Sequence, residues 1–139
     1  MSAAVRYFTR SGNTKKLADA IAKEIGVEAK EVSEPLQEKT DVLFLGSSVY
    51  AAGVDHAVKK FIADNKDKIG CIYNFSTAAL LPSTYNQVKK LAEENGIAMA
   101  EEEFHCRGSF MLMHKNRPNE EDEAKAAAFA KEVMKKKEG

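Results

Sequence analysis

Short apolar runs alternate with amphipathic stretches along the whole chain, and this alternation is the main signal of the fold. The apolar runs predict β-strands over residues 3–8, 27–32, 42–46, 68–75 and within 97–110. Apolar residues spaced three or four apart predict helices over residues 13–25, 55–62, 82–92 and from 119 toward the lysine-rich end. Strands that alternate with helices indicate a parallel sheet with helices on both faces.

The connecting segments refine this order. Gly26 and the Asn95-Gly96 pair are typical helix ends, and Asp55 is a typical helix cap. The segment 33–41 is polar, contains Pro35 and is too short for a full helix with two turns. The second helix of a regular alternating fold is therefore expected to be reduced or absent.

The last helix is predicted from its charges as well as from its apolar residues. Asn119 precedes a first turn of acids, and lysines occupy the last turn, an arrangement that suits the helix dipole. The buried stripe of this helix is expected to be Ala124, Ala127, Ala128, Phe129 and Val133.

Composition narrows the class of protein. The chain of 139 residues is 44% hydrophobic and 30% charged, as expected for one soluble globular domain spanning residues 1–139. It has no apolar run long enough to span a membrane and no signal-peptide pattern, so a cytoplasmic location is expected. The formal net charge of zero argues against a nucleic-acid partner. Cys71 and Cys106 are expected to be buried free thiols, and the three histidines show no metal-ligand spacing.

The segment between the first strand and the first helix carries the strongest chemical signal. Thr9, Ser11 and Thr14 supply hydroxyls, and Gly12 lets the backbone approach a ligand closely. Backbone N–H groups at the positive end of a helix dipole bind anions well. We interpret the loop from Thr9 to Lys15 as a phosphate cradle, with simple helix capping as the alternative. Neither a Walker motif nor a dinucleotide fingerprint is present.

Two more loops are expected at the same edge of the sheet. They cover residues 47–53 and 76–81, after the third and fourth strands, and ligands of open α/β sheets bind outside the carboxyl ends of the strands. Tyr50 is an aromatic residue among small ones and suits a wall against a flat ring, with ordinary surface packing as the alternative. Ser76 and Thr77 offer polar groups to the edge of a heterocycle. A phosphate site beside a planar-ring site predicts a mononucleotide.

These residues resemble the flavin-binding loops of the flavodoxin family. Thr9-Arg10-Ser11-Gly12-Asn13-Thr14 is similar to the family's phosphate loop and occupies the same place, while segments 46–51 and 74–78 stand where the second and third flavin loops stand. The resemblance covers essentially the whole chain. It implies an α/β fold of the flavodoxin-like type, a doubly wound five-stranded parallel sheet in the order 2-1-3-4-5 that binds FMN without a covalent bond.

The resemblance also implies which residues bind the cofactor. The first loop contributes Thr9, Arg10, Ser11, Gly12, Asn13, Thr14 and Lys15 around the phosphate. The second loop contributes Ser48, Val49, Tyr50, Ala51, Ala52 and Gly53, with Tyr50 stacked on the isoalloxazine ring and an alanine carbonyl near flavin N5. The third loop contributes Ser76, Thr77, Ala78 and Ala79 at the pyrimidine edge. No catalytic residue and no metal ligand is predicted.

The function implied by the resemblance is low-potential electron transfer. The first hypothesis is a monomeric carrier that moves electrons between a flavodoxin reductase and acceptor enzymes. The alternative is an FMN oxidoreductase of the quinone reductase or protoporphyrinogen oxidase type. A third possibility, from a different class, is a binding or sensor domain that keeps the fold without stable FMN.

Overall fold

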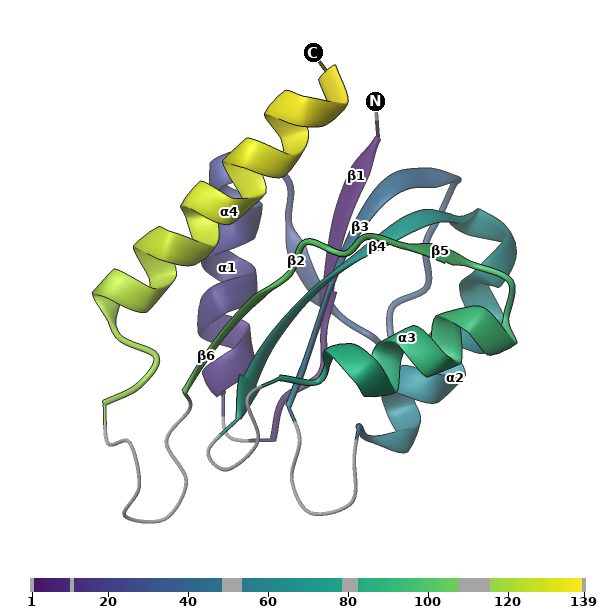
Figure 1. Ribbon diagram of the computed structural model, residues 1–139, viewed down its shortest axis with the longest axis horizontal. Helices are drawn as coiled ribbons and strands as arrows, with labels where there is room; N and C mark the ends of the chain where they lie inside the picture. The colour runs from purple at the N-terminus through teal and green to yellow at the C-terminus, as the bar shows by residue number, and fades with distance from the viewer. Residues whose placement is uncertain (1, 11, 49–53, 79–82, 108–115, 139) are drawn as a thin grey trace.

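The computed structural model describes residues 2–10, 12–48, 54–78, 83–107 and 116–138 of the chain (Figure 1). The strands are β1 (Ala3–Tyr7), β2 (Ala29–Glu31), β3 (Thr40–Ser48), β4 (Ile69–Ala78), β5 (Ala98–Met99) and β6 (Phe104–Arg107). The helices are α1 (Asn13–Ile25), α2 (His56–Asn65), α3 (Tyr85–Glu94) and α4 (Glu120–Glu138), with a short 3-10 turn η1 (Lys66–Lys68) after α2.

The sheet is parallel throughout, and its order confirms the prediction. The strands lie in the order β2-β1-β3-β4-β5, and β6 also pairs with β4. The fifth strand is therefore divided into two pieces: β5 lies beside Cys71 and Ile72, and β6 lies beside the last four residues of β4. The break between the pieces contains the acidic run Glu101-Glu102-Glu103. Charged residues at an exposed sheet edge discourage pairing with a further strand.

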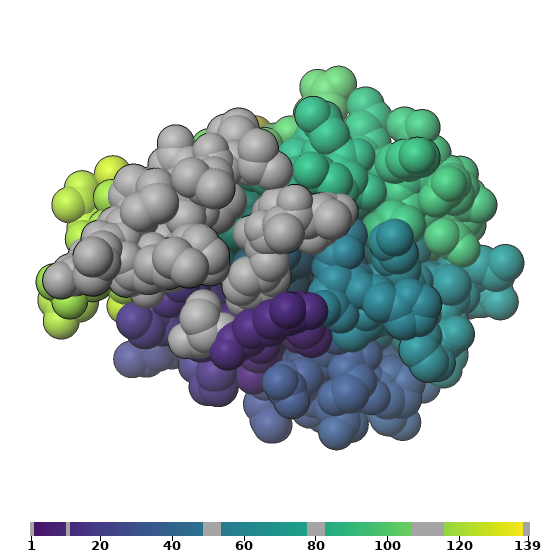
Figure 2. Space-filling model, turned by 90° about the horizontal axis from the view of Figure 1, so that it is seen from below, coloured from purple at the N-terminus to yellow at the C-terminus, as the bar shows by residue number. Residues whose placement is uncertain are grey.

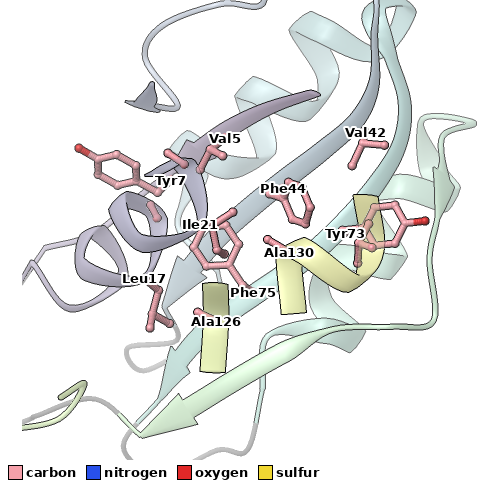
Figure 3. Close-up of a cluster of buried hydrophobic side chains, with 13 residues drawn as sticks. Val5, Tyr7, Leu17, Ile21, Val42, Phe44, Tyr73, Phe75, Ala126 and Ala130 are labelled. Carbon is pink, nitrogen blue, oxygen red and sulfur yellow. The ribbon is translucent and has the colours of Figure 1, made fainter. Parts of the chain in front are cut away.

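Two hydrophobic cores lie on opposite faces of the sheet, because alternate side chains of each strand point to opposite faces. Phe44 and Phe75 point toward α1 and α4, where they pack with Leu17 and Ile21 (Figure 3). The other core contains Leu43, Leu45 and Ile72 from the strands together with Val58 and Ile62 of α2. Helices consequently cover both faces, as the sequence predicted.

The connection between β2 and β3 forms no helix, in agreement with the expectation for this segment. Arg6, a buried residue of β1, donates to the backbone carbonyls of Glu34 at 2.9 Å and Pro35 at 3.3 Å. Asn65 accepts a hydrogen bond from the Leu36 N–H at 3.0 Å, and the Leu36 side chain is buried in the core beside α2. Long-range polar contacts thus fix an irregular segment in the place of a helix.

The buried face predicted for α4 was wrong in part. Val133 is buried as predicted, but Ala124 and Ala128 are exposed, and the fully buried alanines are Ala126 and Ala130. Ala127 and Phe129 are half-buried. Alanines stand on several sides of this helix, so periodicity alone leaves its rotation undetermined. The start of the helix supplies the missing constraint, because the buried Asp122 accepts hydrogen bonds from the Arg117 guanidinium and from the Asn119 N–H.

Candidate functional site

The candidate site lies at the carboxyl edge of the sheet, where β1, β3 and β4 end. Figure 2 views the molecule from this side, with the β1–α1 connection in dark purple beside the start of α2 in teal. Asp55 caps α2 by accepting a hydrogen bond from the Ala57 N–H at 2.9 Å. The same carboxylate forms an ion pair with Arg10 at 2.7 Å, which joins the first connection to the start of α2.

Three hydroxyls from three different elements meet beneath this edge. Thr14 Oγ1 lies 2.5 Å from Ser48 Oγ and 3.1 Å from Thr77 Oγ1, and the latter two atoms are 3.0 Å apart. We call these residues, which come from α1, β3 and β4, the hydroxyl triad. All three are buried. A hydroxyl can donate one hydrogen bond and accept others. A hydroxyl of the triad can therefore donate to an anion while its oxygen still accepts a hydrogen bond from a neighbour.

The first turn of α1 adds backbone donors next to the triad. Gly12 is the N-cap, with φ of 88°, and as a glycine it has no side chain of its own to cap the helix. The first turn contains no acidic residue, and helix geometry leaves its N–H groups without intrahelical acceptors. A methyl group added at Gly12 would meet no atom within 4 Å, so the backbone borders open space. Open space, backbone donors and neutral hydroxyls together suit a phosphate.

Two cations near the start of α1, Arg10 and Lys15, are engaged by carboxylates. Lys15 pairs with Asp19 at 2.8 Å, one turn further along α1. Arg10 pairs with Asp55, and the pKa of Asp55 lies below its usual value because the Ala57 N–H and then the Arg10 guanidinium stabilise its charged form. The groups of the triad itself are neutral, so hydrogen bonding dominates the chemistry of the site.

A second polar cluster lies on the other face of the same two strands. Thr84, the N-cap of α3, accepts hydrogen bonds from Ser47 at 2.9 Å and from Asn74 at 3.1 Å, and its N–H donates to Ser76 at 3.3 Å. These contacts bind the start of α3 to the sheet. The structure therefore places Ser76 in a helix-anchoring cluster, apart from its neighbour Thr77 in the triad.

The structure brings together residues that the sequence assigned to different parts of the ligand. Ser48 was assigned to the ring-binding loop and Thr77 to the pyrimidine edge, but both contact Thr14 of the phosphate loop. The alternation of side chains along a strand could have indicated these contacts. Ser48 lies on the same face of the sheet as Phe44, and Thr77 lies on the same face as Phe75, which is the face covered by α1. Other predicted residues lie outside the described ones, namely Ser11, Val49, Tyr50, Ala51, Ala52, Gly53 and Ala79, while Ala78 ends β4.

Two remaining expectations concern the thiols and metals. Cys71 and Cys106 are free thiols, as predicted, but they are half-buried rather than fully buried. Burial raises the pKa of both thiols, and that of Cys106 reaches about 12. Among the described residues no cluster of metal-ligating side chains occurs, and no helix there is both long and apolar enough to cross a membrane.

Comparisons with known proteins agree with this geometry. Residues 4–103 match the model of the flavodoxin domain family. The chain is 29% identical over 136 residues to the uncharacterized protein MJ0298 of Methanocaldococcus jannaschii, an alignment that covers 88% of this chain and 91% of the relative. In structure it resembles a flavodoxin from the domain Archaea, with a TM-score of 0.81 and 16% identity over 100% of both chains. It also resembles flavodoxin 1 from Bacillus cereus, with a TM-score of 0.74, 22% identity and coverage of 97% and 98%.

The strand order, the two-faced helical cover and these structural matches define a flavodoxin-like α/β protein. Because the family model matches most of its length, the chain belongs to the flavodoxin family.

Proposed function

We propose that this protein binds FMN at the carboxyl edge of the sheet and carries electrons at low potential between a reductase and acceptor enzymes. The observation that carries the proposal is the hydroxyl triad beside the start of α1, where the N-cap is a glycine. FMN supplies reversible acceptance of electrons on its ring, and the protein holds its phosphate and orients the ring. The proposal includes a monomeric, cytoplasmic protein, as expected from the sequence.

The donors of the site fit the phosphate of FMN. Thr14, Ser48 and Thr77 would hold the phosphate by hydroxyl groups, and Thr14 and Lys15 in the first turn of α1 would add backbone N–H groups. Because the Lys15 ammonium is paired with Asp19, the nearby positive charge is partly neutralised. Electron transfer needs only an accessible ring edge, which agrees with the β1–α1, β3–α2 and β4–α3 connections of at most seven residues each.

The test uses two adjacent serines at the end of β3. Ser48 belongs to the triad, whereas Ser47 is equally buried but contacts Thr84 on the opposite face. Loss of a hydroxyl that binds a phosphate costs about 1.5–3 kcal/mol, so Ser48→Ala is expected to weaken FMN binding roughly 10- to 150-fold. Ser47→Ala is the matched control and is expected to bind FMN with nearly unchanged affinity. Quenching of flavin fluorescence during titration gives both affinities.

The results separate binding from folding. Circular dichroism of both variants verifies that the fold is intact before the affinities are compared. Equal FMN affinity of Ser48→Ala and the parent protein would show that the triad does not bind the phosphate. A parent protein that takes up no FMN would refute the flavin proposal altogether.

A further experiment separates a carrier from an enzyme. The FMN-loaded protein is photoreduced and then mixed with quinones, and the rate of quinone reduction is measured with a continuous electron donor. A carrier is expected to react slowly with quinones and rapidly with a one-electron redox protein. Fast multiple turnover of a quinone would instead support the oxidoreductase alternative.

A further inference from the structure

The three helices that begin at the site share an unusual charge pattern. Each carries two consecutive lysines within its first six residues, namely Lys15-Lys16 in α1, Lys59-Lys60 in α2 and Lys89-Lys90 in α3. We call these residues the lysine pairs. The first turns of all three helices contain no acid, whereas α4 has four acids in its first turn.

The lysines in the first turn of α1 oppose the preference of isolated helices. The N-terminus of a helix carries a partial positive charge, so acids near it are stabilising and cations are unfavourable, each by about 0.3–1 kcal/mol. The chain follows the preference in α4, through four acids, and in α2, through the Asp55 N-cap, and departs from it in α1, where Lys15 and Lys16 lie in the first turn. A phosphate bound at the start of α1 would account for the lysines in the first turn of that helix. The lysine pairs of α2 and α3 start at the fourth and fifth residues of their helices, where the dipole has little effect and does not account for them.

The lysine pairs are exposed and only partly neutralised. All six side chains are on the surface. Lys15 pairs with Asp19 and Lys60 with Asp64, and the other four lysines have no ion pair within the described part of the chain. Asp19 is the one acid among the first seven residues of the three helices. Since α1 covers one face of the sheet and α2 and α3 the other, the lysine pairs lie on helices on both sides of the sheet.

We propose that the lysine pairs form the docking surface for a redox protein whose own contact face is acidic; this inference rests on the proposed electron-carrier function. The formal net charge of the chain is zero, so the attraction is local and orients the partner toward the site. The four acids of α4 lie at the left of the molecule in Figure 1, away from α2 and α3, so a long polyanion laid across the molecule would meet them and be repelled. A compact acidic patch fits this arrangement better than nucleic acid or an anionic bilayer.

The test measures electron transfer to one-electron proteins of opposite charge. Photoreduced, FMN-loaded protein is mixed in a stopped-flow instrument with rubredoxin, a small acidic iron protein, or with cytochrome c, a basic haem protein. Each acceptor iron takes one electron, so one fully reduced FMN reduces two acceptors. The rate with rubredoxin is expected to fall as salt rises, because salt screens attraction between exposed charges. A rate that is independent of salt, or faster transfer to cytochrome c at low salt, would overturn the proposal.

Charge variants locate the surface. Lys59→Gln/Lys60→Gln and Lys89→Gln/Lys90→Gln are expected to slow transfer to rubredoxin about threefold or more at low salt. The matched control is Lys135→Gln/Lys136→Gln, which removes the same charge from the exposed last turn of α4. An equal loss in this control would show a general charge effect and contradict a local docking surface.

A flavin-free arm keeps the two proposals separate. Binding of rubredoxin to the chain without added FMN is measured by calorimetry at low salt, with duplex DNA and phosphatidylserine vesicles as competing anions. Binding that the α2 and α3 variants weaken supports the surface even if the protein takes up no FMN. Tighter binding of DNA or vesicles than of rubredoxin would refute an acidic protein as the partner.

Discussion

Gly46 offers a direct test of how the core supports the site. It pairs with Phe75 across β3 and β4, and a methyl group at this position would lie 2.2 Å from Cε2 and 2.3 Å from Cζ of the Phe75 ring. Carbon atoms in van der Waals contact are about 3.5–4.0 Å apart, so the ring must move by more than about 1 Å. Phe75 is fully buried, and overpacking of a dense core costs about 1–3 kcal/mol. Gly46→Ala is therefore expected to lower the free energy of unfolding by that amount.

The assay is urea unfolding of a double-mutant cycle. Phe75→Leu removes the two nearest of the three ring atoms that the new methyl group would meet, so the double variant is expected to lose at least about 1 kcal/mol less than the sum of the single losses. Gly96→Ala is the control, because its methyl group would meet no atom within 4 Å although φ is 68°. Its loss, due to backbone strain of about 1–2 kcal/mol, is expected to add to that of Phe75→Leu. If the losses of stability for Gly46→Ala and Phe75→Leu are additive, the new methyl group does not collide with the Phe75 ring, and the predicted overlap is refuted.

The remaining predictions concern residues outside the triad. Burial alone would raise the pKa of Asp122, but Arg117 and the Asn119 N–H outweigh it, so the pKa lies below its usual value. Its stabilisation is therefore complete above about pH 4 and is lost as the pH falls through the folded-state pKa. Asp122→Asn is expected to cost about 2 kcal/mol in urea unfolding at pH 6 and progressively less as the pH is lowered from 4 toward 2, and a cost that does not fall with pH would contradict this. Cys106, with a pKa of about 12, is expected to resist iodoacetamide at pH 8 in the native protein and to react in urea, as followed by mass spectrometry; rapid native alkylation would exclude a protonated, shielded thiol. Asn65→Ala is expected to cost about 1–3 kcal/mol in thermal or urea unfolding, because it leaves the buried Leu36 N–H without its acceptor; a neutral effect would show that the 33–36 segment is held by other contacts.

Local signals made much of the fold predictable. The stripe of Leu17 and Ile21, with Gly26 after it, predicted the bounds of α1 that the structure shows. Long-range contacts were not predictable in the same way. The carbonyls that Arg6 binds lie about 28 residues away in the chain, and no local pattern indicates such a contact.

The site shows the same division. The Thr14 loop was identified because its hydroxyls and glycine stand directly before a helix. The contacts of Thr14 with Ser48 and Thr77 depend on the register of β3 with β4, in which Ser48 lies beside Thr77. Register is a tertiary property, so the sequence supplied the residues of the triad but assigned two of them to the flavin ring.

Comparison of FMN with riboflavin, which lacks only the phosphate, tests the central claim most directly. The hydroxyl triad and the start of α1 are expected to bind the phosphate alone, so the parent protein should bind FMN at least about 30-fold more tightly than riboflavin, or about 2 kcal/mol. Ser48→Ala should narrow this difference by weakening FMN binding and leaving riboflavin binding unchanged. Equal affinity of the parent protein for the two flavins would contradict a phosphate site at the hydroxyl triad.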